Sequence, residues 1–138
     1  MRLSLSFLVI LNLATALISP QPLAADEIIN EVYLLVRNDK LLAFSGIQNK
    51  WSEKNLRAGE TVTESKYDGN VAVAYTKDRA LAFSGLTGRW AEERLRIRET
   101  VVSISAKGNV ATVITDIRAL GFGAQKGVWL ESQFDIGE

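Results

Sequence analysis

Apolar residues recur in short runs along the chain, and turn-forming residues separate the runs. Between residues 61 and 98 the runs cover 61–66, 71–76, 79–84 and 90–95, with Asp, Gly and Asn between them. Runs of this length, bounded by such residues, predict β-strands joined by tight turns. No apolar stripe with the 3.6-residue period of a helix extends over a useful length. The pattern therefore predicts an all-β fold.

Two of the expected strands are apolar or small on both faces. In 71–76 the sequence VAVAYT places two valines and a tyrosine on one face and small residues on the other, and 79–84 behaves alike. A strand that is covered on both faces lies in a sheet packed between two others. Small residues opposite large ones suit sheets that stack about 10 Å apart. We therefore expect stacked sheets.

Segments 51–56 and 90–95 have a competing preference. The second lies in WAEERLRIRE, whose residues favour a helix by intrinsic propensity. Tertiary contacts must override that propensity for a strand to form there. We assign both segments as strands, with a helix as the alternative.

One sequence unit occurs three times. Trp51, Trp90 and Trp129 are evenly spaced, because 90 − 51 and 129 − 90 are both 39. Other residue types keep the same spacing: Phe44, Phe83 and Phe122; Leu42, Leu81 and Leu120; Lys40, Arg79 and Arg118; Glu53, Glu92 and Glu131; Glu60, Glu99 and Glu138. The chain therefore contains three repeats of about four strands each, with boundaries near 26–59, 60–98 and 99–138.

The run VVSISAKGNVATVITDIRALGFGAQKGVW resembles the blade repeat of quinoprotein-type (PQQ-like) β-propellers. The shared features are a small first strand before a Gly turn, an apolar second strand, an aliphatic third strand ending in small residues, and a blade tryptophan. The resemblance covers most of 60–138 and, more loosely, 28–59. It implies three four-stranded propeller blades. Lys77-Asp78 and Asp116-Ile117 replace the family's usual Asp-Gly turn, and its quinone and calcium ligands have no counterpart, so the resemblance implies an architecture and not dehydrogenase chemistry.

A β-trefoil is the alternative architecture, because it also has three four-stranded units of similar length and closes within one chain. The length favours a trefoil, whereas the strands that are apolar on both faces favour a propeller. A propeller ring needs about four or more blades, so three blades leave an apolar face open at each end. We expect a dimer that completes a six-bladed ring, in which blade three of each copy meets blade one of the other.

Residues 1–25 have the pattern of a secretory signal peptide. Arg2 precedes an apolar run over 7–17, and small residues lead to Ala25, after which we expect cleavage. The apolar run is shorter than the about 20 residues that span a bilayer. The sequence predicts an exported, periplasmic or extracellular β-repeat domain over 26–138, with no membrane span after leader removal.

Composition narrows the chemistry. The chain contains no Cys and no His, which excludes serine triads with an imidazole base, cysteine nucleophiles and nearly all zinc or copper sites. Lys+Arg and Asp+Glu are both 16, and loss of Arg2 leaves 15 − 16 = −1. A near-neutral chain argues against nucleic acid as a partner. We expect no cofactor and no metal site.

A cation begins the third strand of every repeat, and an acid lies close to it. These residues are Lys40, Arg79 and Arg118, with Asp39, Asp78 and Asp116. They are interpreted either as exposed ion pairs, which contribute little to stability, or as a ring of charges at one end of the molecule. Together with Arg96 and Glu99, such a ring would bind an anionic peptide or glycan.

The repeated tryptophans also have two interpretations. Trp51, Trp90 and Trp129 either pack between neighbouring blades or form sugar-stacking platforms. The Q-x-x-W spacing of Gln48 and Trp51 does not match the Q-x-W of ricin-type trefoil lectins.

The repeated carboxylates suggest a further candidate, glycoside hydrolysis by paired acids. The residues concerned are Glu53, Glu60, Glu92, Glu93 and Glu99. The alternative for Glu60 and Glu99 is bonding to loop N–H groups. Because related groups recur in the repeats, we expect no catalytic residue. The sequence favours a non-catalytic exported module that binds a protein or glycan through its loops, with a trefoil-like lectin as the alternative and a hydrolase less favoured.

Overall fold

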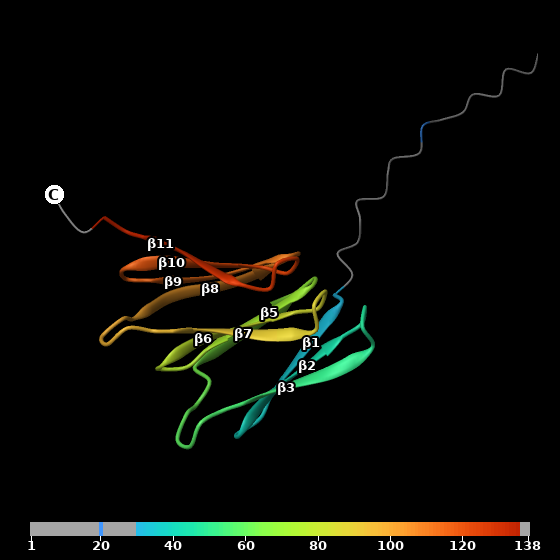
Figure 1. Cartoon of the computed structure of the whole chain (residues 1–138), viewed down its shortest axis with the longest axis horizontal. Helices are drawn as coiled ribbons and strands as arrows, with labels where there is room; N and C mark the ends of the chain where they lie inside the picture. Colours follow the sequence, from blue (N-terminus) through green and yellow to red (C-terminus); the bar gives the residue numbers. More distant parts are fainter. Residues whose placement is uncertain (1–19, 21–29, 136–138) are drawn as a thin grey trace, which may run out of the picture.

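The computed structural model describes residue 20 and residues 30–135, which form three antiparallel sheets and no helix (Figure 1). Each sheet is a meander of consecutive strands. Sheet 1 contains β1 (Val32–Val36), β2 (Lys40–Ser45) and β3 (Lys50–Asn55); sheet 2 contains β4 (Glu64–Asp68), β5 (Val71–Tyr75), β6 (Arg79–Ser84) and β7 (Arg89–Arg94); sheet 3 contains β8 (Val101–Lys107), β9 (Val110–Thr115), β10 (Arg118–Gly123) and β11 (Trp129–Gln133). The all-β prediction is confirmed.

Sheet 1 has three described strands where four were expected. The counterpart of β4 in the first repeat is 25–29, from 64 − 39 and 68 − 39, and it lies outside the described residues. The predicted signal peptide at 1–25 also lies outside them, apart from residue 20. The strand expected at 61–66 begins three residues later, at Glu64.

The segments with helix propensity are strands. In all three sheets the repeated phenylalanine is paired with the repeated tryptophan of the next strand, as in Phe83 and Trp90. The ring centroids of these pairs lie 5.3, 5.3 and 5.4 Å apart. Aromatic cross-strand contacts of this kind stabilise a sheet, and here they outweigh local propensity.

Sheet 2 is the middle layer. We call the face of each sheet that carries the repeated phenylalanine and tryptophan its front face, and the opposite face its back face. The front face of sheet 2 packs on the back face of sheet 1 in one core cluster that includes Phe83 and Ala43. The front face of sheet 3 packs on the back face of sheet 2 in a second cluster that includes Phe122 and Ala82. All six residues of β6 are buried, so the predicted strand covered on both faces is confirmed.

Neighbouring sheets are closest at their first strands. β4 lies against both β1 and β8, whereas the last strands, β3, β7 and β11, have few contacts with one another. The sheets therefore fan out from one edge of the stack. None of the described sheets closes into a barrel, which a β-trefoil requires, so the trefoil alternative is wrong.

Tight turns lock neighbouring sheets together. Gly69 has the predicted positive φ (52°), and a Cβ at this position would collide with the backbone of Gly108 in the next sheet. The Asn70 N–H donates to the Gly108 carbonyl over 2.8 Å, and the Gly69 N–H donates to Asn30 Oδ1 over 3.1 Å. Only glycine fits this close approach without strain.

Candidate functional site

Arg79 lies in a buried polar network at one end of sheet 2. Its guanidinium donates to both oxygens of Glu60 over 2.9 and 2.7 Å and also to Glu92. It reaches the preceding sheet through the carbonyl of Asn55, 2.9 Å away. Thr76 donates its hydroxyl to Glu60 over 2.8 Å. A bidentate guanidinium–carboxylate pair of this kind satisfies two charges at once.

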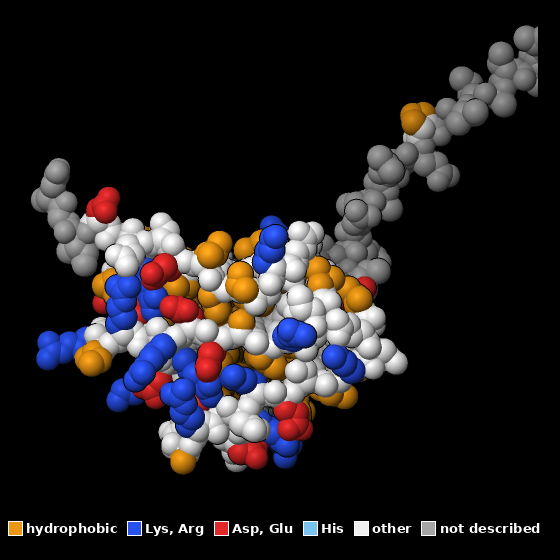
Figure 2. All heavy atoms as spheres, in the orientation of Figure 1, with side chains coloured by type: hydrophobic (Ala, Val, Ile, Leu, Met, Phe, Trp, Pro, Cys, Tyr) orange, Lys and Arg blue, Asp and Glu red, His pale blue; other side chains and the backbone are white. Residues whose placement is uncertain are grey.

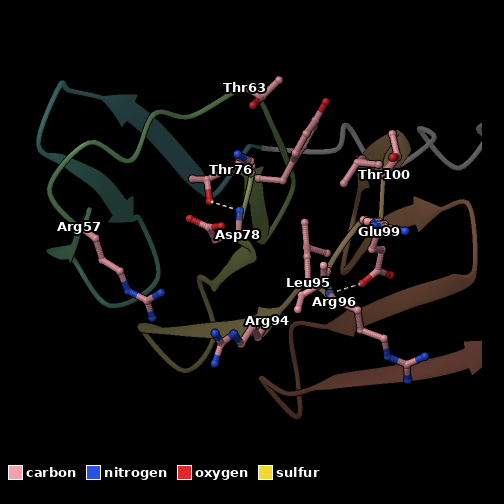
Figure 3. A pocket seen from close by; sticks show the side chains of 14 residues that line it. Arg57, Thr63, Thr76, Asp78, Arg94, Leu95, Arg96, Glu99 and Thr100 are labelled. Carbon is pink, nitrogen blue, oxygen red and sulfur yellow. Dashed lines mark hydrogen bonds between the residues drawn. The ribbon is translucent and has the colours of Figure 1, made fainter.

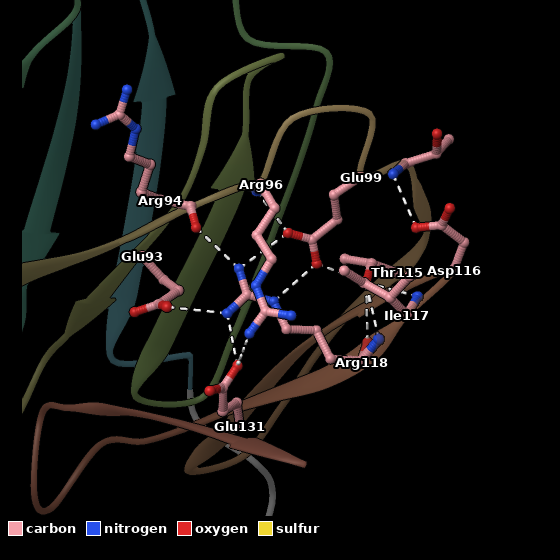
Figure 4. A network of polar contacts seen from close by, with 10 residues as sticks. Glu93, Arg94, Arg96, Glu99, Thr115, Asp116, Ile117, Arg118 and Glu131 are labelled. Atoms are coloured by element: carbon pink, nitrogen blue, oxygen red, sulfur yellow. Dashed lines mark hydrogen bonds and ion pairs between the residues drawn. The ribbon is translucent and has the colours of Figure 1, made fainter. Parts of the chain in front are cut away.

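Sheet 3 repeats this network around Arg118 (Figure 4). Its guanidinium donates to both Glu99 oxygens over 2.8 and 2.9 Å and to Glu131 over 2.7 Å. From sheet 2 it also binds the Glu93 carboxylate at 3.1 Å and the Arg94 carbonyl at 2.8 Å. The network joins two sheets as well as two strands.

The interpretation of these cations as exposed ion pairs is wrong for two of the three. Arg79 is 5% and Arg118 is 2% exposed. Lys40 in the first repeat is half-buried and forms a single ion pair with Glu53 at 3.4 Å. Both arginines use their donors on groups inside the fold.

The loop glutamates have low pKa values. The hydrogen bonds from Arg79 are the main reason that the pKa of Glu60 falls to about 2. Burial raises the pKa of Glu99, but bonds from Arg118, the Arg96 N–H and Thr115 outweigh it and bring the pKa to about 2. The N–H groups of Arg57 and Arg96 donate to Glu60 and Glu99 over 2.9 and 2.8 Å, so the predicted loop bonding is confirmed.

Glu60, Glu92 and Glu99 do not match the proton-donating acid of a glycosidase. A glycosidase acid needs a raised pKa so that it holds a proton near neutral pH. The pKa values of Glu60, Glu92 and Glu99 are all lowered by their arginine partners. They are therefore ionised structural groups. The described residues also contain no cluster of acidic side chains suited to a metal ion.

The three candidate aspartates are exposed, and each accepts a hydrogen bond from the connection between two sheets. The carbonyls of Asp39 and Asp78 accept the N–H groups of Leu56 and Leu95, each over 2.8 Å. The side chain of Asp116 accepts the Thr100 N–H over 3.0 Å. They hold the connections between sheets against the strand turns.

A cleft of about 830 Å³ opens between sheets 2 and 3 at this end (Figure 3). Its walls are the β5–β6 turn, the end of β7 and the connection to β8, with Arg57 reaching in from the segment after β3. The cationic lining residues are Arg57, Lys77, Arg94, Arg96 and Arg98. Figure 2 shows Lys and Arg gathered at the end of the molecule where these connections lie in Figure 1. Of the predicted ligand-binding residues, Arg96, Asp78 and Glu99 line this cleft.

Sequence reasoning missed most of the exposed cations of the cleft. Arg57, Lys77, Arg94 and Arg98 were not predicted as binding residues. The repeat alignment contains a signal for one of them, because Arg98 stands where the preceding repeat has Gly59. The other three occupy ordinary surface positions: Lys77 and Arg94 lie at one end of sheet 2, and the tertiary fold brings Arg57 beside them from the segment after β3.

Two of the three tryptophans lie between sheets. Trp90 donates its indole N–H to the Ser52 carbonyl of sheet 1, and Trp129 donates to the Ala91 carbonyl of sheet 2, both over 3.2 Å. Trp51, on the front face of sheet 1, is 52% exposed. Among the three, Trp51 alone has the exposure that a sugar-stacking platform needs.

No family model matches this chain, and no curated protein matches it either. None of the described residues forms a helix long and apolar enough to cross a membrane.

Proposed function

We propose that this protein is an exported, non-catalytic binding module of the β-propeller type that completes its ring with a second copy and binds a protein or glycan at its loop end. The blade resemblance, the consecutive antiparallel meanders and the stacking that fans out from the first strands support the propeller architecture. The leader pattern supports export. The missing His and Cys and the low pKa values of the buried glutamates support a binding role rather than catalysis.

The proposed assembly is supported mainly by the exposed apolar residues on the two outer sheet faces. The front face of sheet 1 has no described sheet in front of it and exposes Tyr33 (49%) and Trp51 (52%). The back face of sheet 3 is likewise open and exposes Val110 (53%) and Leu130 (74%). Inside the chain, front faces pack on back faces at both sheet contacts. A second copy can therefore repeat the same contact.

The sizes of the residues on the two open faces are complementary. Tyr33 of the front face stands where Ala72 and Ala111 stand in the other sheets. On the back face, Gly121 stands where Ala43 and Ala82 stand. Ala72 and Ala43 belong to one core cluster, and Ala111 and Ala82 belong to the other. A tyrosine facing a glycine would thus replace an alanine facing an alanine at the contact between copies.

The same arrangement of the two copies would also allow a hydrogen bond between them. The carbonyls of Ser52 and Ala91 accept the indole N–H groups of Trp90 and Trp129. The counterpart of these carbonyls in sheet 3 is that of Leu130, which would accept from Trp51 of the second copy. Front-to-back contact joins unlike faces, and with two copies it closes around a twofold axis.

Light scattering of the purified protein tests this assembly. We expect a dimer for the wild type and monomers for Trp51→Lys and Gly121→Leu. A Cβ at Gly121 meets open space within the chain, so the leucine leaves the fold unstrained while it blocks the contact. The control is Ile97→Lys, which adds the same charge as Trp51→Lys at a loop residue that is 95% exposed. This control should stay dimeric.

Mixing the two monomeric variants adds a sharper test. In a pair of Trp51→Lys with Gly121→Leu, one of the two contacts combines two unaltered faces. We expect the mixture to regain a dimer, which neither variant forms alone. A wild-type protein that stays monomeric, or a mixture that never associates, would refute the front-to-back ring.

A further inference from the structure

The connection from sheet 2 to sheet 3 contains a residue whose backbone conformation opposes its type. Arg96–Glu99 forms a turn in which the Glu99 N–H donates to the Arg96 carbonyl over 3.1 Å, and Arg98 has φ 66°. The equivalent turn of the preceding repeat has Gly59 at this position, with φ 77°. A turn with positive φ only at its third residue favours glycine there. Arginine at this position is strained. The second repeat therefore carries a positive charge where the first has an unstrained glycine.

The strained arginine lines the cleft between sheets 2 and 3. Arg57, Lys77, Arg94 and Arg98 are all exposed, and none of them forms an ion pair with any residue in the described part of the chain. Arg96 has a long contact of 3.6 Å with Glu131. The two acids of the lining are Asp78 and Glu99, and Glu99 is already paired with Arg118. The cleft is therefore strongly positive.

A positive cleft with low-dielectric walls attracts anions, and arginine matches the geometry of carboxylate and phosphate groups. The volume of about 830 Å³ lies within the range of ligand sites, about 300–1,000 Å³. Figure 3 shows Arg57 and Arg94 on one side of the cleft and Arg96 with Glu99 on the other. The ligand that fits must carry negative charge and fill a space of several residues or sugar units.

The remaining lining favours a saccharide over an added peptide strand. A peptide that adds to a sheet edge as a further strand is held largely by main-chain hydrogen bonds. Main-chain N–H groups around this cleft already donate within the chain: those of Thr63, Asp78, Leu95, Arg96, Glu99 and Thr100. The exposed side chains of the lining include guanidinium groups, the hydroxyls of Thr63 and Thr100, and part of the Tyr75 ring. Charges, hydroxyls and an aromatic ring suit a polyhydroxylated anion.

We propose that this cleft binds an anionic saccharide, with Arg98 as a residue placed at conformational cost to contact its carboxylate or ester oxygens. This inference rests on the proposed function as a binding module and names the class of ligand taken at the loop end. It does not depend on the ring, because every lining residue comes from one chain.

Calorimetry with trigalacturonate, at low and at physiological salt, tests the site on the whole protein. We expect binding that weakens with salt and that falls about tenfold in Arg98→Asn, which removes a charge-assisted contact while asparagine tolerates the positive φ. Arg98→Gly should weaken binding as strongly and raise the Tm by about 4 °C, because it relieves the backbone. A purely structural arginine would not show this opposition between stability and affinity.

The matched control is Arg89→Asn, which removes an exposed arginine at the far end of β7. It should leave affinity unchanged. Equal loss in this control, equal binding of uncharged maltotriose, or tighter binding of hexaglutamate would each overturn the saccharide site. Light scattering of the same samples separates the two proposals. A dimer that binds no trigalacturonate refutes only this site, and a monomer that binds it refutes only the ring.

Discussion

At the scale of single residues, the environment of a side chain depends on whether another sheet lies beyond it. Lys40, Arg79 and Arg118 hold the same place in the repeat, yet only the two arginines are buried. Both sit between two sheets, where carbonyls of the preceding sheet complete their hydrogen bonds. Lys40 belongs to the first sheet and has no such neighbour in the described part of the chain. Side chains at equivalent repeat positions therefore contribute differently to the free energy of folding.

Replacing Arg118 with leucine should destabilise the fold by about 3–5 kcal/mol, because it leaves the buried Glu99 charge unpaired. The same change at Lys40 should cost about 0–1 kcal/mol, since its ion pair with Glu53 is partly exposed. Urea unfolding of the two variants measures the difference. Similar losses for both would mean that the arginine network adds nothing beyond a surface pair.

The network also predicts how stability depends on pH. The pKa values of Glu60 and Glu99 are about 2 in the fold, against 4.5 for a free glutamate. As the pH falls, the glutamates of the unfolded chain bind protons before those of the folded chain. The stability that Glu60 and Glu99 contribute is therefore fully present above pH 4.5 and is lost as the pH drops toward 2. Unfolding curves across this window test the sign. Glu99→Gln should flatten the fall, and a protein equally stable at both ends of the window would contradict the assignment.

At the scale of strands and sheets, a small set of hydrogen bonds recurs at each sheet contact. Ser45 donates its buried hydroxyl to the Gly85 carbonyl of the next sheet over 2.6 Å, and Ser84 donates to the Ala124 carbonyl over 2.5 Å. The Ser84 oxygen also accepts the N–H groups of Leu86 and Thr87. In sheet 3 the equivalent residue is Gly123. The hydroxyl is present where a following sheet receives it within the chain and is absent where the stack ends.

Ser84→Ala should therefore cost about 1–3 kcal/mol, because a buried carbonyl and two turn N–H groups lose their partner. Ser132→Ala, on the exposed last strand, is the matched control and should change stability by about 0.5 kcal/mol or less. Thermal or urea unfolding of both variants gives the comparison. A neutral Ser84→Ala would show that water replaces the hydroxyl at the sheet contact.

At the scale of the whole molecule, three sheets in a row form a stack with one inner layer. Among the described residues, each core cluster joins two neighbouring sheets, so stability depends on the sheets and the contacts between them. Sheet 2 has two such contacts, and sheets 1 and 3 have one each in the described part of the chain. In a chain kept monomeric by Gly121→Leu, the outer layers should open more readily than the middle one.

Amide hydrogen exchange tests this order. In that monomer we expect the slowest exchange at residues of β5 and β6 such as Val73 and Ala82, and faster exchange in β3 and β11. In the proposed dimer, the protection of β11 should rise relative to the monomer. Slowest exchange in β11 of the monomer would contradict the layered picture.

Much of the fold was predictable because its signal is local. A short apolar run bounded by turn-forming residues predicted β6 at 79–84, and the two-faced apolar pattern predicted a covered middle sheet. The start of β4 was misplaced by three residues, since the strand begins at Glu64 and not at 61. The candidate site was less predictable. Arg96, Asp78 and Glu99 were identified in the sequence, but the exposed cations beside them come from three separate segments.

The sequence by itself determined the repeat period and most of the strands, because side-chain patterning and turn chemistry act over short stretches of chain. Tertiary contacts made β3 and β7 strands against their helix propensity. Tertiary structure alone decided which copy of each residue is buried. It enclosed Arg79 and Arg118, placed Trp90 and Trp129 between sheets while leaving Trp51 open, and gathered cations from separate segments into one cleft. The physical reason is that burial and charge pairing depend on the neighbouring layer, and in the described part of the chain the first sheet has no layer in front of it, whereas its two copies have one.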